Sequence, residues 1–395
     1  MEIDQALWAK LRENLRPETV VGLARELVCV PSDTPEGEER AATVLEGFFR
    51  QVGVKTERQP VKGFGVNVIA TLPGETDAPG LLYNGHLDTV PPSAAMPYPP
   101  FEGIIKNDQI WGRGTADMKG GLAAMACALA AVHAAGVHLK RSVQLAAVAA
   151  EEHGNHGTWT LIQQGVRAEF AVVGEATDLD LVVAHKGVDR YQVIVEGRAA
   201  HGSEPEKGVN AIIHAAAILT ALDQQLFPKA RQSRHPFLGP ATYNVGTIQG
   251  GISRNTVPDR CVFQIGKRWL PGDSPEAIRA EIEAVVTQAQ GDARASVVHE
   301  PEFDVVPHPP LELDPDHPHA RVLADTIREL TGQAPALQAM SGFTDGALLY
   351  GAGIPTLIFG PGGSSLAHSD NEYISVSEMV LAAQVFAAFA VRTCA

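Results

Sequence analysis

The strongest constraint on the fold is the alternation of short apolar segments with helical ones in the first part of the chain. Four apolar segments have the length and composition of strands: 67–72, 80–90, 142–152 and 170–176. The Ala-rich stretch 120–136 is typical of a helix, and 35–53 has an amphipathic helical pattern that ends at Gly53. Strands that alternate with helices indicate an α/β sheet covered on both faces.

The pattern changes near His185. The following segments read in order as strand, helix, strand, strand, helix and strand: 191–197, 208–226, 241–248, 259–270, 274–289 and 293–300. This β-α-β-β-α-β order is that of ferredoxin-like domains. After about residue 302 the α/β character returns, with a helix over 319–332, a strand over 354–360 and a final helix from Ser375. We therefore predict a discontinuous domain of residues 1–183 and 303–395, with residues 184–302 inserted into it.

Composition excludes some classes of function. The 395 residues carry a formal net charge of −15, whereas proteins that bind nucleic acid are usually basic, so nucleic acid is not an expected partner. No unbroken apolar run of about 18 residues is present, so no membrane span is expected. The start of the chain lacks the pattern of a signal peptide, which predicts a cytoplasmic protein.

The four cysteines are scattered and form no C-x-x-C pair, and they are Cys29, Cys127, Cys261 and Cys394. This spacing cannot supply a Cys-rich zinc site, and disulfides are not expected in a reducing compartment.

Polar side chains recur where the predicted strands end. His86 and Asp88 follow one strand, and residues two apart on an extended chain face the same side, so Asp88 could orient a metal-binding His86. A solvated strand end is the alternative for an isolated H-x-D. Asp117 lies in a glycine-rich turn, which could instead bind phosphate, although the G-x-G-x-x-G and G-x-x-x-x-G-K-[ST] patterns are absent.

Further acids and a histidine follow the later strands. Glu151 and Glu152 end one strand, Glu175 closes the next, and His368 follows the strand over 354–360. Ligands bind at strand ends in open α/β sheets. Two histidines and three carboxylates would balance the charge of two divalent cations and a hydroxide, with zinc as the expected metal and manganese or cobalt as alternatives.

Competing motifs are weaker. The H-E-x-x-H and G-x-S-x-G signatures are absent. An H-x-x-H pattern does occur at His153 and His156, but it is short, and we interpret it as loop or helix-start polarity.

Five ordered motifs make the chain resemble the zinc amidohydrolase and peptidase family of acetylornithine deacetylase, succinyl-diaminopimelate desuccinylase, aminoacylase-1 and the glutamate carboxypeptidases. The motifs are NGHLDTVPP, GRGTADMKGG, AAEEHG, GEATD and GPGGSSLAHSDNEY, and the resemblance runs from about Pro31 to the C-terminus. It implies a zinc-peptidase-like α/β/α sandwich with an inserted ferredoxin-like lid or dimerisation domain. AAHGSEPEKGVNAI and GGISRNTVPD resemble parts of that lid.

The resemblance also implies roles for the site residues. His86 and Glu175 would hold one zinc, Glu152 and His368 the other, and Asp117 would bridge both. Glu151 would be the general base, and Asp88 would orient His86. His201 would act from the lid of the partner chain of a homodimer to stabilise the oxyanion.

Substrate contacts are carried over less directly. Arg268, in the match RWLPG, and Asn255 would hold the substrate carboxylate, although Arg268 could also be an ordinary exposed strand residue. Thr344 and Asp345, in SGFTDGALL, resemble a segment that faces substrate in some relatives, and Thr344, Gly362 and Gly363 would contact substrate. Gly202 stands where many relatives have Ser or Ala, which would alter only local backbone freedom.

The function expected from these motifs is hydrolysis of an amide bond in an N-acyl amino acid, in the manner of acetylornithine deacetylase or succinyl-diaminopimelate desuccinylase. A dipeptidase or carboxypeptidase that acts on short peptides is the close alternative. A binding protein without catalysis on the same fold is a more remote one, and the intact ligand set with Glu151 argues against it.

Overall fold

The computed structural model describes residues 3–76 and 78–395, which divide into two compact units. Unit 1 consists of residues 1–183, 313–338 and 344–395, and unit 2 of residues 184–312 and 339–343. The sequence placed the end of the inserted segment at residue 302, whereas unit 2 continues to Glu312, because β15 (Leu311–Glu312) pairs with the last residues of β8.

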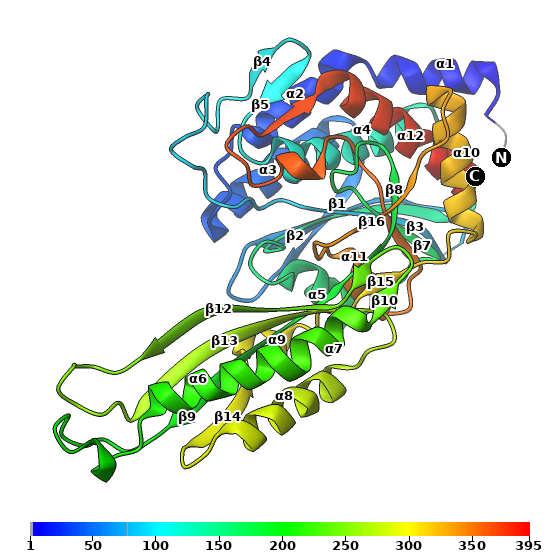
Figure 1. Ribbon diagram of the computed structural model, residues 1–395. Coiled ribbons are helices and arrows are strands. Elements are labelled where there is room, and N and C mark those ends of the chain that lie inside the picture. The colour runs from blue at the N-terminus through cyan, green and yellow to red at the C-terminus, as the bar shows by residue number, and fades with distance from the viewer. Residues whose placement is uncertain (1–2, 77) are drawn as a thin grey trace. The chain divides into compact units, whose positions relative to one another are not determined.

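Unit 1 is built on a mixed sheet (Figure 1) whose strands lie in the order β1-β2-β6-β3-β7-β17-β8. The strands are, in chain order, β1 (Lys55–Pro60), β2 (Val66–Leu72), β3 (Pro79–His86), β6 (Ser142–Val148), β7 (Phe170–Val173), β8 (Leu181–His185) and β17 (Thr356–Ile358). A short strand, β16 (Leu337–Met340), pairs with β8. Strands β6, β3, β7 and β17 are mutually parallel, so their carboxyl ends meet at one edge of the sheet.

Helices cover both faces of this sheet. One face packs against α3 (Pro35–Gln51), α4 (Gly120–Ala134) and α12 (Val376–Cys394). Helices α1 (Gln5–Asn14), α2 (Pro17–Val28) and α10 (Pro318–Thr331) pack on these helices. The opposite face carries α5 (His156–Gln163) and α11 (Gly346–Gly351). A small separate sheet of β4 (Ile104–Lys106), β5 (Gln109–Trp111) and β18 (Tyr373–Ser375) completes the unit. The predicted α/β/α sandwich is confirmed.

Local sequence explains where the predicted helices begin. The hydroxyl of Thr34 accepts a hydrogen bond from Gly37 N at the start of α3, and Pro35 occupies the first helical position. The hydroxyl of Ser375 caps α12 in the same way through Glu378 N. Helices α1 and α2 are features that the sequence reasoning missed.

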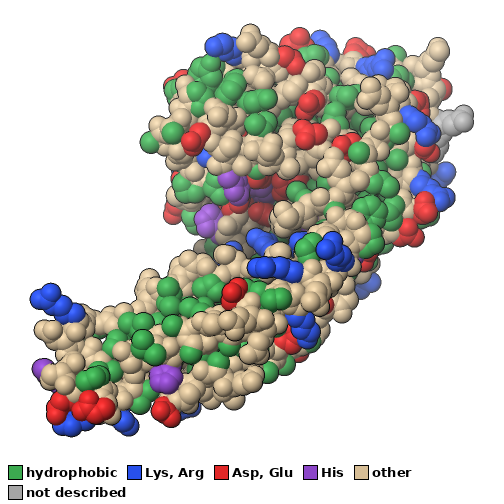
Figure 2. All heavy atoms as spheres, viewed as in Figure 1, with side chains coloured by type: hydrophobic (Ala, Val, Ile, Leu, Met, Phe, Trp, Pro, Cys, Tyr) green, Lys and Arg blue, Asp and Glu red, His purple; other side chains and the backbone are tan. Residues whose placement is uncertain are grey.

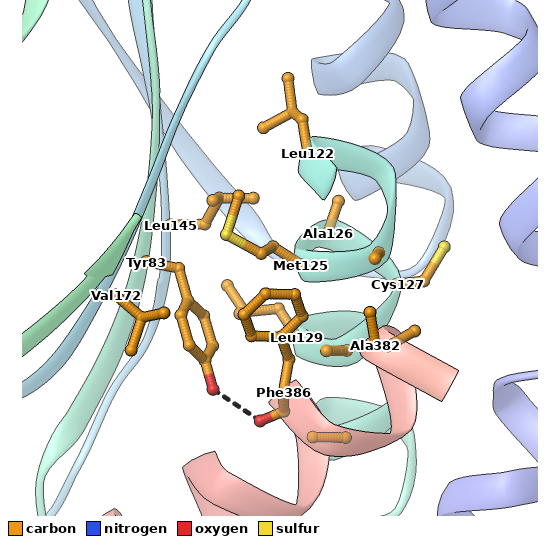
Figure 3. Close-up of a cluster of buried hydrophobic side chains, with 14 of the residues drawn as sticks. Tyr83, Leu122, Met125, Ala126, Cys127, Leu129, Leu145, Val172, Ala382 and Phe386 are labelled. Carbon is orange, nitrogen blue, oxygen red and sulfur yellow. Dashed lines mark hydrogen bonds between the residues drawn. The ribbon is translucent and has the colours of Figure 1, made fainter. Parts of the chain in front are cut away.

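The core of unit 1 lies between the sheet and helices α4 and α12 (Figure 3). Residues 120–132 of α4 are all buried, which is why its composition is apolar on every side. The hydroxyl of Tyr83 on β3 donates to the carbonyl oxygen of Phe386 on α12 at 2.5 Å, so the buried phenol is satisfied. Residues 115–134 and α12 are long and apolar enough to cross a membrane by length and composition, a test that buried core helices also pass. In the structure, 94% of an 18-residue apolar stretch within residues 115–134 is buried, and 56% of such a stretch within α12.

Unit 2 contains an antiparallel sheet in the order β12-β13-β9-β14 (Figure 1), whose bounds are Thr242–Gly250, Arg260–Trp269, Gly187–Glu196 and Arg294–His299. Helices α6 (Ala211–Ala221) and α8 (Pro275–Ala289) pack on one face over a core that includes Phe263 and Ile282. The chain order β9-α6-β12-β13-α8-β14 is that of the predicted ferredoxin-like unit. The remaining short elements are η3 (Leu222–Leu226), α7 (Phe227–Gln232), β10 (Arg234–His235), β11 (Gly239–Pro240) and α9 (Pro301–Val305).

Candidate metal centre

The carboxyl ends of three parallel strands bring the polar residues of unit 1 together. His86 is the last residue of β3, Glu151 and Glu152 follow β6, and Glu175 follows β7. The register places His86 beside Val148 and Asn84 beside Val173, so the three strands end at nearly the same level. Residues that are far apart in the sequence therefore converge at one edge of the sheet.

Two further residues reach this edge from other segments. Asp117 lies in η1 (Thr115–Lys119), the turn before α4, and His368 follows η4 (Ser364–Leu366) with a left-handed φ of 60°. The start of α4 lies very close to the end of β7. A Cβ at Gly121 would lie only 2.0 Å from the carbonyl oxygen of Gly174. Only glycine fits there, and this contact helps to bring Asp117 close to Glu175.

Asp117 joins two clusters through its two carboxylate oxygens. Its Oδ1 lies 2.9 Å from His86 Nε2, which is also 3.6 Å from Glu175 Oε1. Its Oδ2 lies 3.2 Å from His368 Nε2, which is 2.7 Å from Glu152 Oε1. In each cluster one atom from each of the three residues lies within 4.8 Å of the others. Figure 2 shows histidine and acidic side chains gathered in one area of the unit 1 surface.

The electrostatics of these clusters favour bound cations. Burial raises the pKa of Glu175 well above its ordinary value, and Asp117 and Glu152 raise it further. Burial opposes protonation of His86, but hydrogen bonds to Asp117 and Asp88 outweigh burial and raise its pKa. Hydrogen bonds to Asp117 and Glu152 raise the pKa of His368 to about 10. The acids thus repel one another, and divalent cations would relieve that repulsion. Nitrogen and oxygen donors in this proportion fit zinc.

Asp88 performs two structural tasks beside the clusters. It is fully buried, with its backbone oxygen 2.9 Å and its Oδ1 3.5 Å from His86 Nδ1. Its two carboxylate oxygens also accept the backbone N–H groups of Glu151 and Glu152 at 3.1 and 2.9 Å. One carboxylate therefore fixes the ring of His86 and the turn that carries both glutamates.

The turn before these glutamates is held in the same manner. Ala149 N donates to Asn67 Oδ1 and Ala150 N to Glu38 Oε2, both at 3.0 Å. With the two bonds to Asp88, four successive backbone N–H groups donate to side-chain oxygens from other elements. Burial, and then the charge of Asp88, raise the pKa of Glu38 to about 7. Sequence reasoning missed Asn67 and Glu38, because each lies within a regular strand or helix pattern.

The Asp117 turn has its own support. Glu372 is fully buried and pairs with Arg113 at 2.5 Å. Its carboxylate also accepts the N–H groups of Gly114, Ala116 and Asp117 at 3.1, 3.0 and 3.2 Å. Lys119 is also buried and donates to Val30 O, and burial lowers its pKa to about 7. Glu372 stands in the last of the five motifs, which was the available signal.

His153 and His156 lie at the start of α5. The ring of His156 stacks on Phe64 at 4.3 Å. His153 is partly exposed, with Nδ1 3.6 Å from Asp88 Oδ2. Neither belongs to a group of residues with metal-ligand spacing among the described part of the chain.

The predicted substrate contacts of unit 1 are structural neighbours of the clusters. Thr344 is buried, and its hydroxyl accepts a hydrogen bond from Gly346 N. Gly362 has a φ of 85°, and a Cβ there would lie 3.6 Å from that of Ala116. A Cβ on Gly363 would lie 2.9 Å from Asp178 Oδ1. The two glycines lie in the loop between β17 and η4, whereas Thr344 precedes α11. Contact with substrate stays a prediction for all three residues.

The other three predicted residues belong to unit 2. His201 is exposed and forms an isolated antiparallel β-bridge with Thr256. The next residue, Gly202, donates its N–H to Asn255 O at 2.8 Å. A Cβ on Gly202 would lie 2.9 Å from the Asn255 carbonyl group, so this glycine also permits close approach of the two segments. Arg268 on β13 is half-buried, and burial together with Arg190 lowers the pKa of its guanidinium.

A sandwich with an inserted ferredoxin-like unit and paired histidine–carboxylate clusters defines a metal-dependent hydrolase of amide bonds. The chain belongs to peptidase family M20/M25/M40, whose family model matches residues 82–392. This family assignment confirms the expected resemblance and the enzyme class.

Several relatives match along nearly their whole length. The chain is 31% identical to acetylornithine deacetylase of Proteus mirabilis, covering 92% of this chain and 94% of the relative. It is 27% identical to N-formyl-4-amino-5-aminomethyl-2-methylpyrimidine deformylase of Bacillus subtilis, covering 95% of each. The crystal structure of aminopeptidase PepT from Bacillus cereus is 27% identical and superimposes with a TM-score of 0.78, covering 96% of this chain and 99% of that one.

Proposed function

We propose that this protein is a two-metal hydrolase that removes a small acyl group from an N-acyl amino acid, with zinc as its metal. The observation that carries the proposal is the position of Asp117, whose two oxygens face His86 and His368. Glu175 completes the first ligand set and Glu152 the second. The relatives named a deacetylase and a deformylase support an amide substrate whose acyl group is small.

The contacts of the adjacent glutamates support different roles for them. Both glutamates have ligand spacing to His86, and Glu152 also contacts His368, which supports assigning Glu152 to the second ligand set. Glu151 instead accepts a hydrogen bond from Asn155 through Oε1. Burial raises the pKa of Glu151 well above its ordinary value, which favours uptake of a proton by this carboxylate.

The reaction follows from these roles. Two bound divalent ions would polarise the amide carbonyl and make a water molecule more acidic. The Glu151 carboxylate takes a proton from the attacking water as the new C–O bond forms. It then delivers that proton to the amine nitrogen as the C–N bond breaks, which leaves a carboxylic acid and a free amine. The acid releases its own proton to become a carboxylate. Asp88 and Glu372 keep the ligands in place throughout.

Cationic groups of unit 2 support binding of the substrate carboxylate. Burial, and then the charge of Arg268, lower the pKa of Lys186. Burial, and then the charge of Arg190, lower the pKa of Arg268, so these cations lie close enough to repel one another. An anion bound among them would relieve this repulsion. We propose that Arg268 and Asn255 hold the carboxylate of the amino acid. Contact of Thr344, Gly362 and Gly363 of unit 1 with substrate stays a prediction.

The surface of unit 2 supports a homodimer. Strand β12 is an edge of its sheet, and edge strands offer unpaired N–H and C=O groups to another chain. Four isoleucines near it are exposed by 37% to 92%: Ile212, Ile213, Ile248 and Ile252. Figure 2 shows hydrophobic side chains along the surface of this unit. We propose that two chains pair here and that the partner subunit's His201 stabilises the oxyanion. The expected cytoplasmic location stays a prediction.

Hydrolysis of short peptides is the second candidate, and the likeness to aminopeptidase PepT favours it. Purified protein with zinc, cobalt or manganese should be assayed against N-formyl, N-acetyl and N-succinyl amino acids and a peptide panel. Turnover of peptides, with none of the N-acyl amino acids hydrolysed, would show that the protein is a peptidase.

The variant Glu151→Ala tests the assignment of roles. We expect it to lose at least about 100-fold in kcat, the lower bound of a general-base contribution, while it retains its metal content. Glu26→Ala, an exposed glutamate of α2, is the matched control and should behave as wild type. Loss of metal from Glu151→Ala would show that the two adjacent glutamates have the reverse roles.

A further inference from the structure

The amide of Asn155 lies between two buried carboxylates of unit 1. Its Nδ2 is 3.0 Å from Glu151 Oε1 and 3.0 Å from Asp345 Oδ1. Asn155 precedes α5 and Asp345 precedes α11, two helices that pack together on the same face of the sheet. Asn155 is 3% exposed and Asp345 only 1%, so water does not replace these bonds readily.

The two acceptors fix the orientation of the amide. An NH₂ group has two hydrogens, and here each points to a carboxylate oxygen. Rotation of the amide by half a turn would place its oxygen against both carboxylates, which repel it. The Asn155 backbone has a left-handed φ of 59°, a conformation that asparagine and glycine tolerate best. The position is thus shaped for a short side chain with a donor amide.

The carboxylate of Asp345 has two side-chain neighbours that lower its pKa by hydrogen bonding, Asn155 and Thr158. Among residues 3–76 and 78–395, its second oxygen, Oδ2, is buried without a hydrogen bond. Burying a carboxylate so incompletely paired is costly. Burial accordingly raises its pKa to about 6. The hydrogen bond from the amide of Asn155 links this carboxylate to that of Glu151.

We propose that Asn155 and Asp345 are positioning residues that hold the carboxylate of Glu151 in its productive orientation. Asp345 orients the amide of Asn155, and the amide occupies Oε1 of Glu151, which leaves Oε2 to exchange the proton. The inference rests on the proposed function, in which Glu151 carries that proton.

Kinetics of four variants provide the first test. Asn155→Gly removes the amide and keeps the backbone conformation, so kcat should fall about 10- to 100-fold, with KM within about threefold and with full metal content. Asp345→Ala should have a similar effect, whereas Asp345→Asn retains an acceptor oxygen and should lose much less. The double variant Asn155→Gly with Asp345→Ala should be no slower than Asn155→Gly alone, because both act through one contact.

A control separates positioning from loss of stability. Thr326 is a buried residue of α10, far in sequence from both residues, with hydrogen bonds to Val322 O and Arg392. Thr326→Val should lower the melting temperature without changing kcat. If it lowers kcat as much as Asn155→Gly does, or if the double variant shows the product of the two single losses, the proposal is wrong.

Crystal structures of the zinc-loaded wild type and Asn155→Gly supply a readout that needs no substrate. The Glu151 carboxylate should have one conformation in the wild type and several, or a displaced one, in the variant. An unchanged carboxylate would overturn the proposal. If the wild type hydrolyses no compound of the panel, the proposed function fails, while these two structures still decide whether Asn155 positions Glu151.

Discussion

Glu151 and Glu152 have the same side chain and adjacent positions, yet they meet different surroundings. The backbone turn after β6 directs one toward Asn155 and the other toward His368. The backbone N–H groups of both glutamates donate to the carboxylate of Asp88, which also lies against His86. At the scale of single residues, the role of a group is set by its hydrogen-bond partners.

Replacement of Asp88 should therefore affect both features. Asp88→Ala leaves two backbone N–H groups without an acceptor, at about 1–3 kcal/mol each, and frees the ring of His86. We expect a lower free energy of unfolding and roughly 10- to 100-fold weaker metal binding. Denaturant unfolding and metal titration measure the two effects. Asp88→Asn, which retains one acceptor oxygen, should be milder, and the exposed Asp316→Ala is the control. Unchanged metal affinity in Asp88→Ala would contradict this role.

At the scale of elements, the site depends on segments that carry no ligand. Glu372 precedes β18 and holds the turn that begins α4, through three N–H groups and Arg113. The parallel pairing of β3, β6 and β7 then aligns the strand ends that carry the other groups. The carboxylate of Asp117, which contacts both His86 and His368, is positioned by this joint support.

Glu372→Ala tests the support of the Asp117 turn. It leaves the buried guanidinium of Arg113 without its partner, a change that usually costs about 3–5 kcal/mol. Thermal unfolding should show a large loss of stability, and metal content should fall because Asp117 is no longer fixed. Glu372→Gln keeps an acceptor and should retain more metal. Combining Glu372→Ala with Arg113→Leu should cost less stability than the sum of the single changes; strict additivity would argue against the pair.

At the scale of the whole molecule, the proposed dimer predicts exchange of functional residues between chains. In a dimer of one His201→Ala chain and one Glu151→Ala chain, one site would have both residues intact and the other neither. Random mixing gives such dimers in half of the population, so mixing two inactive variants should restore about a quarter of wild-type activity. Activity assays after mixing and re-equilibration measure this, with light scattering as a check on dimerisation. No recovery from a verified dimer would show that His201 acts within its own chain or not at all.

The sequence by itself determined the sandwich, the inserted ferredoxin-like unit and the ends of most long elements. Apolar periodicity, glycine and capping residues such as Thr34 and Ser375 are local signals, and they act over a few residues. The motifs also identified His86, Asp117, Glu152, Glu175 and His368 as a candidate set.

Only the tertiary structure decided which groups support that set. Asn67, Glu38 and Asn155 lie in unremarkable local patterns, and Asp345 is suggested only by a loose match to a substrate-facing segment. Their contacts with the site span up to 190 positions of the chain. A buried polar group is defined by the partner that satisfies it, and strand register and helix packing bring that partner near. Local sequence carries no record of such a pairing, because the two halves of each hydrogen bond meet only when the sheet and its helices have assembled.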